Sequence, residues 1–133
     1  MTIEAQRADF VLVPTQDMER AIEFYGGTLG LRRSNEHAQW AEFELGNATL
    51  AIGNPEQVGW DFDPLPKGAI AIRVPDVDAA RGELEAAGVQ FEGDTHDSGV
   101  CRMAFFSDRD GNGLLFHRRH APYPDGSTPD EQD

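Results

Sequence analysis

The sequence is poor in cysteine and in long apolar stretches, and each shortage excludes a class of protein. Its single cysteine, Cys101, can form neither an internal disulfide nor a thiolate metal cluster. No window approaches the ~18 consecutive apolar residues of a membrane-spanning helix. The opening residues, MTIEAQRADF, lack the basic start and apolar run of a secretion signal. We therefore expect a cytoplasmic protein without a membrane segment.

Basic residues are also scarce. Lys and Arg total 11 against 24 Asp and Glu, which gives a formal net charge of −13 over 133 residues. Such a chain repels phosphate backbones and anionic lipid, so we expect neither nucleic acid nor a membrane surface as a partner. The charge fits either an acidic surface that stays free of such partners or a preference for cationic ligands.

The order of predicted elements repeats once along the chain. Valines and a closing proline predict a strand at 9–14, and Asp17 begins an amphipathic helix that Gly30 ends. The same pattern restarts with a strand at 69–74, the cap Asp76 and a helix that Gly88 ends. Three strands are predicted after each helix, at 31–37, 39–45 and 48–53 and again at 89–92, 100–107 and 113–118. The halves form a weak internal repeat of strand, helix and three strands.

We expect one domain over 1–120, with unit one at about 8–53 and unit two at about 68–118. Between them, 54–67 holds three prolines and shows no period, which predicts a linker or a surface loop. Its Trp60 and Phe62 either cover the core or form a lid on a ligand pocket. The acidic, proline-rich tail at 121–133 has no apolar stripe, and we expect it to be disordered.

Two motifs carry a family resemblance. The stretch from Asp17 to Tyr25, followed by Thr28-Leu29-Gly30-Leu31, resembles the first helix "D-x-x-x-A-x-x-F-Y…L-G-F" of the vicinal oxygen chelate superfamily, which includes glyoxalase I, bleomycin-resistance proteins and extradiol dioxygenases. Asp108-Arg109-Asp110-Gly111-Asn112 is similar to its "D-P-D-G-N" turn, with Arg109 in the proline position. The resemblance covers about 8–118. It implies an α+β fold in which two tandem βαβββ units form a cupped mixed sheet around a central cavity.

The resemblance also locates the metal ligands of the metal-dependent members. Carried over one by one, the four positions fall on Phe10, Ala51, Ala69 and Leu115, and none of these side chains can coordinate a metal. A shift by one residue reaches apolar neighbours, except for Asp9, which then points to the other face. We therefore expect no metal and no other cofactor.

The strand period of two predicts which side chains share the cavity face. We expect these ligand-binding residues to be Phe10, Leu12, Thr49, Ala51, Ala69, Ala71, Arg73, Leu115 and His117, with Trp60 from the linker. The residues of opposite parity should pack under the helices. His117 is the candidate catalytic residue, as a general base or donor, unless it is a partly exposed histidine at a strand end. Arg73 either binds a ligand carboxylate or forms a surface salt bridge.

Two further patterns leave alternatives. Glu42 and Glu44 share one side of a predicted strand, where they could hold a cationic ligand or, with His37 or His117, a relocated metal; otherwise they form a solvated face. Asp108-x-Asp110-x-Asn112 matches the start of an EF-hand loop, but Arg119 occupies the position of the required glutamate, so we reject calcium binding.

Three functional classes follow. The first is a binding protein without the usual metal ligands, which holds a small organic molecule, cationic or not, in an apolar cavity without turnover. The second is a lyase, isomerase or dioxygenase-type enzyme with relocated metal ligands or metal-free acid–base chemistry at His117. The third is a non-catalytic accessory domain. By analogy with family members of this size, we expect a homodimer.

Overall fold

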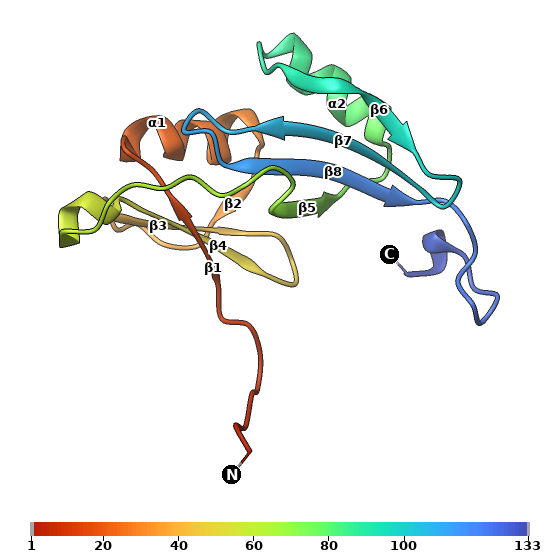
Figure 1. Cartoon of the computed structure of the whole chain (residues 1–133), viewed down its shortest axis with the longest axis horizontal. Helices are drawn as coiled ribbons and strands as arrows, with labels where there is room; N and C mark the ends of the chain where they lie inside the picture. Colours follow the sequence, from red (N-terminus) through yellow and green to blue (C-terminus); the bar gives the residue numbers. More distant parts are fainter. Residues whose placement is uncertain (1, 133) are drawn as a thin grey trace. The chain divides into compact units, whose positions relative to one another are not determined.

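The computed structural model describes residues 2–132, which divide into two compact units, the first ending at Pro64 and the second beginning at Leu65. Each unit contains a strand, a helix and three further strands in that order, and each forms its own four-stranded mixed sheet (Figure 1). The predicted α+β class and the repeated βαβββ unit are therefore confirmed.

The first unit forms a sheet in the order β1-β4-β3-β2. Strand β1 pairs with β4 in parallel, and the other pairs are antiparallel. Asp17 caps the helix as predicted, because its side chain accepts a hydrogen bond from the Arg20 N–H at 3.1 Å. The elements are β1 (Val11–Pro14), α1 (Met18–Ile22), the π-helix η1 (Glu23–Thr28), β2 (Arg32–Arg33), β3 (Trp40–Glu44), β4 (Thr49–Gly53) and the 3-10 helix η2 (Pro55–Val58).

One face of this sheet is the core of the first unit. Five of its inward side chains are buried, and α1 packs against β4. They are Val13, Ala41, Phe43, Leu50 and Ile52. Their strand neighbours point the other way, and the pairing register places Trp40 beside Gly53 and Glu42 beside Ala51 on that side. We call this side the second face of the first sheet.

The second unit repeats the arrangement with the order β5-β8-β7-β6, in which β5 and β8 are parallel. Asp76 caps its helix through a bond from the Ala79 N–H at 3.1 Å. Helix α2 lies over one face of the sheet, where it contacts β6, β7 and β8 (Figure 1). The elements are β5 (Ile70–Arg73), α2 (Val77–Ala86), β6 (Phe91–Asp97), β7 (Cys101–Ser107), β8 (Gly113–Arg119) and the 3-10 helix η3 (Pro129–Gln132).

The aspartate- and glycine-rich motif before β8 is a structural turn. The Asp108 carboxylate accepts bonds from the Asp110 and Asn112 N–H groups, each at 2.9 Å, and from the Asn112 side chain at 2.8 Å. Asn112, fully buried, accepts the Leu65 N–H at 2.8 Å. Next to it, Gly113 has no room for a side chain, because a Cβ would lie 2.1 Å from the Pro66 carbonyl oxygen. The motif thus fixes the start of the second unit to the β7–β8 hairpin.

The strand predicted at 31–37 is wrong in length, since β2 covers only Arg32–Arg33. The reason is Asn35, whose amide donates to the Trp40 carbonyl at 2.7 Å and accepts the Glu42 N–H at 2.9 Å. A side chain thus takes the bonding positions on β3 that a longer strand would use. The predicted first helix also changes character, because its second half is the π-helix η1, where the Leu29 N–H reaches back to the Phe24 carbonyl.

The strand predicted at 89–92 is also wrong in its bounds. The strand at 89–92 becomes β6 at Phe91–Asp97, so His96 and Asp97 lie on a strand and not in a loop. The sequence hides this strand because its register shifts between Glu92 and His96, where Gly93 has a φ of 68°. Arg81 of α2 holds the irregular segment through a bond to the Gly93 carbonyl at 2.8 Å.

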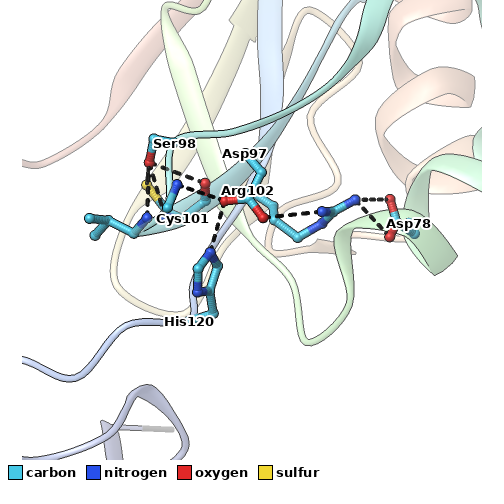
Figure 2. Close-up of polar contacts among 8 residues, drawn as sticks. Asp78, Asp97, Ser98, Cys101, Arg102 and His120 are labelled. Carbon is cyan, nitrogen blue, oxygen red and sulfur yellow. Dashed lines mark hydrogen bonds and ion pairs between the residues drawn. The ribbon is translucent and has the colours of Figure 1, made fainter.

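A polar cluster joins this hairpin to α2 and to the end of β8 (Figure 2). Asp97 contacts the His120 imidazole at 2.9 Å and accepts the Gly99 N–H at 2.8 Å. Arg102 reaches both oxygens of Asp78, at 2.8 and 2.9 Å, and Asp97 at 3.4 Å. Hydrogen bonding from His120 and from the Gly99 backbone lowers the pKa of Asp97 to about 2.

Residues after β8 fold back on its end. Arg119 donates to the carbonyls of Ala121 and Pro122, at 2.9 and 2.7 Å, and stacks over the Tyr123 ring at 4.5 Å. Arg118 pairs with Asp130 at 3.0 Å. These contacts attach the acidic C-terminal segment to the second unit.

Candidate functional site

A pocket of about 310 Å³ opens within the first unit. The volume lies at the lower end of the range typical of small-molecule sites. Its walls come from three parts of the unit: the second face of the first sheet, the turn between β2 and β3, and η2 with Trp60, which follows it closely. The lining residues are Leu12, Pro14, His37, Gln39, Trp40, Gly53, Asn54, Pro55, Gln57, Val58 and Trp60.

The chemistry of these walls is mostly apolar. Leu12, Val58 and Trp60 are exposed despite their size, by 43%, 65% and 65% respectively. The polar groups are one imidazole and three amides, and the lining contains no Asp, Glu, Lys or Arg. Such a site holds an organic molecule by shape and apolar contact, with a few hydrogen bonds to orient it.

Trp40 lines the pocket, and several contacts fix the position of its side chain. Its indole N–H donates to the Glu42 carboxylate at 3.2 Å. The Phe10 ring meets the Trp40 ring edge to face, with centroids 5.5 Å apart at 83°. Beneath it, Gly53 leaves room for the indole, since a Cβ on Gly53 would lie 3.3 Å from two ring carbons.

The opposite wall belongs to the predicted linker. Asn54 caps η2 by accepting the Glu56 N–H at 3.0 Å, and Gly59 ends it with a φ of 82°. The backbone N–H of Trp60 then donates to the Pro55 carbonyl oxygen at 3.0 Å, which turns the chain back at this point. Local hydrogen bonds thus place Trp60 beside the pocket, while its side chain stays largely exposed.

Five of the predicted ligand-binding residues belong to the first unit. Leu12 and Trp60 line the pocket. Phe10 contacts Trp40 from outside the lining, and Ala51 is fully buried. Thr49 donates to the Glu44 carboxylate at 2.8 Å.

The other five belong to the second unit and follow one face of its sheet. The register pairs Ala71 with Leu115 and Arg73 with His117. Ala69, Ala71 and Arg73 are exposed, whereas Leu115 is buried and His117 half-buried. Of the residues of opposite parity in this unit, Ile70, Leu114 and Phe116 are buried, whereas Ile72 is half-buried.

The four residues onto which the resemblance carries the family's metal ligands have no metal-binding side chain. Phe10, Ala51, Ala69 and Leu115 carry no donor atom in their side chains. Within residues 2–132, no group of three or more His, Cys, Asp or Glu side chains is placed to hold a metal ion elsewhere. Asp9, the carboxylate nearest these positions in the chain, pairs with Arg7 at 3.4 Å and is exposed.

Glu42 and Glu44 lie on the second face of the first sheet, beside Ala51 and Thr49. Both carboxylates have resident donors. Glu42 accepts the Trp40 N–H, and hydrogen bonds from Ser34 and Thr49 lower the pKa of Glu44. The two carboxylates therefore act as hydrogen-bond acceptors for neighbouring side chains. Of the two, Glu42 is connected to the pocket, because it binds the indole of the lining residue Trp40.

Nine of the pocket residues were not among the predicted ligand-binding residues. They include His37, Gln39 and Trp40 around the start of β3, and the η2 residues. The signal in the sequence was a proline-rich linker that carries one of the two tryptophans, Trp60. The path of that linker depends on the hydrogen bond of Asn54 with Glu56 and on those of Gly59 and Trp60 with the Pro55 carbonyl, and these do not show as a motif.

Residues 7–116 match the family described as Glyoxalase/Bleomycin resistance protein/Dioxygenase superfamily, which spans most of the chain. The chain belongs to this superfamily. An uncharacterized protein of Mycolicibacterium smegmatis is 34% identical over 109 residues, which cover 80% of this chain and 89% of the relative.

Solved structures share the fold. A glyoxalase/bleomycin resistance protein from Streptomyces sp. CB03234 is 27% identical with a TM-score of 0.67, covering 85% of this chain and 100% of that one. TnmS3, an antibiotic binding protein from the same organism, is 24% identical with a TM-score of 0.74, covering 89% and 99%. The superfamily holds both enzymes and binding proteins on one fold, so the reaction must be argued from the site.

Among the described residues, no helix has the length and apolar composition needed to cross a membrane.

Proposed function

We propose that this protein binds a small organic molecule in the pocket of its first unit, without a metal ion and without turnover. The observation that carries the proposal is that both tryptophans of the chain, Trp40 and Trp60, line one pocket whose walls are mostly apolar. Large aromatic side chains left exposed at a concave site mark a place where a ligand or partner covers them.

The residues at the family's metal positions support the metal-free part of the proposal. Apolar side chains at Phe10, Ala51, Ala69 and Leu115 cannot replace the carboxylate or imidazole ligands that a divalent ion needs. Two structural relatives support the binding part, since one is an antibiotic binding protein and the other a glyoxalase/bleomycin resistance protein.

The charge of the chain narrows the ligand class further. A net charge of −13 repels anions from the whole surface. The lining of the pocket contains no Lys or Arg, so it offers no lysine or arginine counter-ion for an anionic ligand. We expect ligands that are uncharged or cationic.

The test combines metal analysis with ligand screening. Protein purified without chelator is incubated with manganese, nickel, zinc and iron(II), desalted, and analysed for bound metal by mass spectrometry. We expect far less than one ion per chain. The chelator-treated protein is then screened against an uncharged fragment library by ¹H–¹⁵N spectra of the two indole N–H groups. One tightly held ion per chain, or a library that leaves both indole signals unmoved, would overturn the proposal.

A further inference from the structure

The pocket contains one aromatic ring that is fixed before any ligand arrives. Three neighbours hold the Trp40 side chain. The Glu42 carboxylate accepts its indole N–H, the Phe10 ring meets the indole edge to face, and the Gly53 backbone lies beneath the ring. Its backbone is braced too, because the Asn35 amide donates to the Trp40 carbonyl at 2.7 Å. A ring held in this way loses little freedom when it makes a contact.

The hydrogen-bonding capacity of this ring is already used. An indole has a single donor and no acceptor, and the Trp40 donor is bound to Glu42. Trp40 therefore contributes ring carbon atoms to the lining of the pocket and no free hydrogen-bonding group. Within the lining, hydrogen bonds can come instead from the Gln39 and Gln57 amides.

We propose that the ligand carries a planar aromatic ring that stacks on Trp40, and that Gly53 and Glu42 are positioning residues that set the angle and height of the indole. This inference rests on the proposed function, because it assigns the ligand class of the same pocket. The size of the pocket, about 310 Å³, suits a fused ring of modest size better than a large ligand.

Two uncharged probes with the same carbon skeleton test the assignment: 2-naphthylmethanol and decahydro-2-naphthylmethanol. Binding of each to the full chain is measured by isothermal titration calorimetry. An aromatic pair contributes about 0.5–1.5 kcal/mol beyond buried area, so the planar probe should bind about 2- to 12-fold tighter. Equal affinities of the two probes would overturn the aromatic assignment and leave the proposed function standing. Binding of neither probe would overturn both.

Substitution of Gly53 tests the positioning role. In Gly53→Ala the new methyl group would lie 3.3 Å from the indole, which must shift to make room for it, so the preference for the planar probe should fall. Gly82→Ala is the matched control, since a Cβ on Gly82 meets no atom within 4 Å. An unchanged preference in folded Gly53→Ala would overturn the role of Gly53.

Glu42 provides a second route that does not depend on the fold tolerating Gly53→Ala. Glu42→Leu removes the acceptor of the Trp40 N–H, whereas Glu42→Gln keeps an oxygen there. We expect the leucine variant to lose the planar preference and the glutamine variant to retain most of it. In the ¹H–¹⁵N spectrum, the Trp40 indole signal should shift in Glu42→Leu before any probe is added. A leucine variant with the wild-type preference and an unshifted indole signal would overturn the role of Glu42.

Discussion

The buried amide of Asn112 holds the backbone N–H of Leu65 at 2.8 Å, although the two residues lie far apart in the chain. The same side chain donates to Asp108 at 2.8 Å. One fully buried residue thus completes the turn before β8 and fixes the start of the second unit.

Replacing Asn112 by alanine should destabilise the protein by about 1–3 kcal/mol, because it leaves a buried N–H and a carboxylate oxygen without their partner. Denaturant unfolding followed by circular dichroism measures the change. Asn47→Ala, at an exposed turn between β3 and β4, is the control and should change stability by less than ~0.5 kcal/mol. Similar midpoints for the two variants would contradict the structural role of Asn112.

Arg81 should stabilise β6 from the side of α2. Its guanidinium donates to the Gly93 carbonyl at 2.8 Å and to Thr95 at 3.2 Å, and lies 4.9 Å from the centre of the Phe91 ring. Arg81→Met keeps the stem and should lose about 1–2 kcal/mol of unfolding free energy with the hydrogen bonds. Arg81→Lys keeps the charge but not the planar fork, so it should recover only part of the loss. Full recovery by lysine would show that charge alone matters.

Stability should fall at acid pH through Asp97. Its pKa is lowered from 3.8 to about 2 in the folded protein, chiefly by the hydrogen bond with His120. A carboxylate with a depressed folded pKa adds stability above its unfolded value, and that stability is lost as the pH falls from about 4 toward 2. In Asp97→Asn, the denaturant midpoint of unfolding should therefore depend less on pH over this range than in the wild type. Asp94→Asn, exposed on the same strand, is the control, and an equal loss of pH dependence there would contradict the assignment.

The net charge of the chain should also affect ligand binding. 2-Naphthylmethylammonium should bind tighter than 2-naphthoate at low ionic strength, because the net charge of −13 attracts the cation and repels the anion. The difference should shrink in about 1 M salt, where the Debye length is ~3 Å. Calorimetric titrations of both probes at the two salt concentrations measure it. Tighter binding of 2-naphthoate would contradict the expectation that the ligand is uncharged or cationic.

Much of the fold follows from local sequence. Asp17 and Asp76 cap their helices because capping needs only a short side chain beside the first turn. The alternation of buried and half-buried residues along β3 follows from strand geometry. Family motifs then placed the repeated unit, and the structure confirms it.

The parts that could not be predicted depend on contacts between distant residues. Asn35 shortens β2 by binding β3, and Arg81 holds an irregular β6 that has no regular pattern. The aspartate- and glycine-rich turn was visible as a motif, but its bond to Leu65 was not. In the same way, Trp60 was recognised as unusual, while the wall it forms with Trp40 required the path of the linker.

The most direct test is a ¹H–¹⁵N titration of chelator-treated, ¹⁵N-labelled protein with 2-naphthylmethanol, following the two indole signals. The sequence has two tryptophans and both line the proposed site, so these signals report on that pocket. We predict that both indole signals shift and saturate together at one probe per chain. Saturable shifts of backbone amides in the second unit, with both indole signals unmoved, would contradict it.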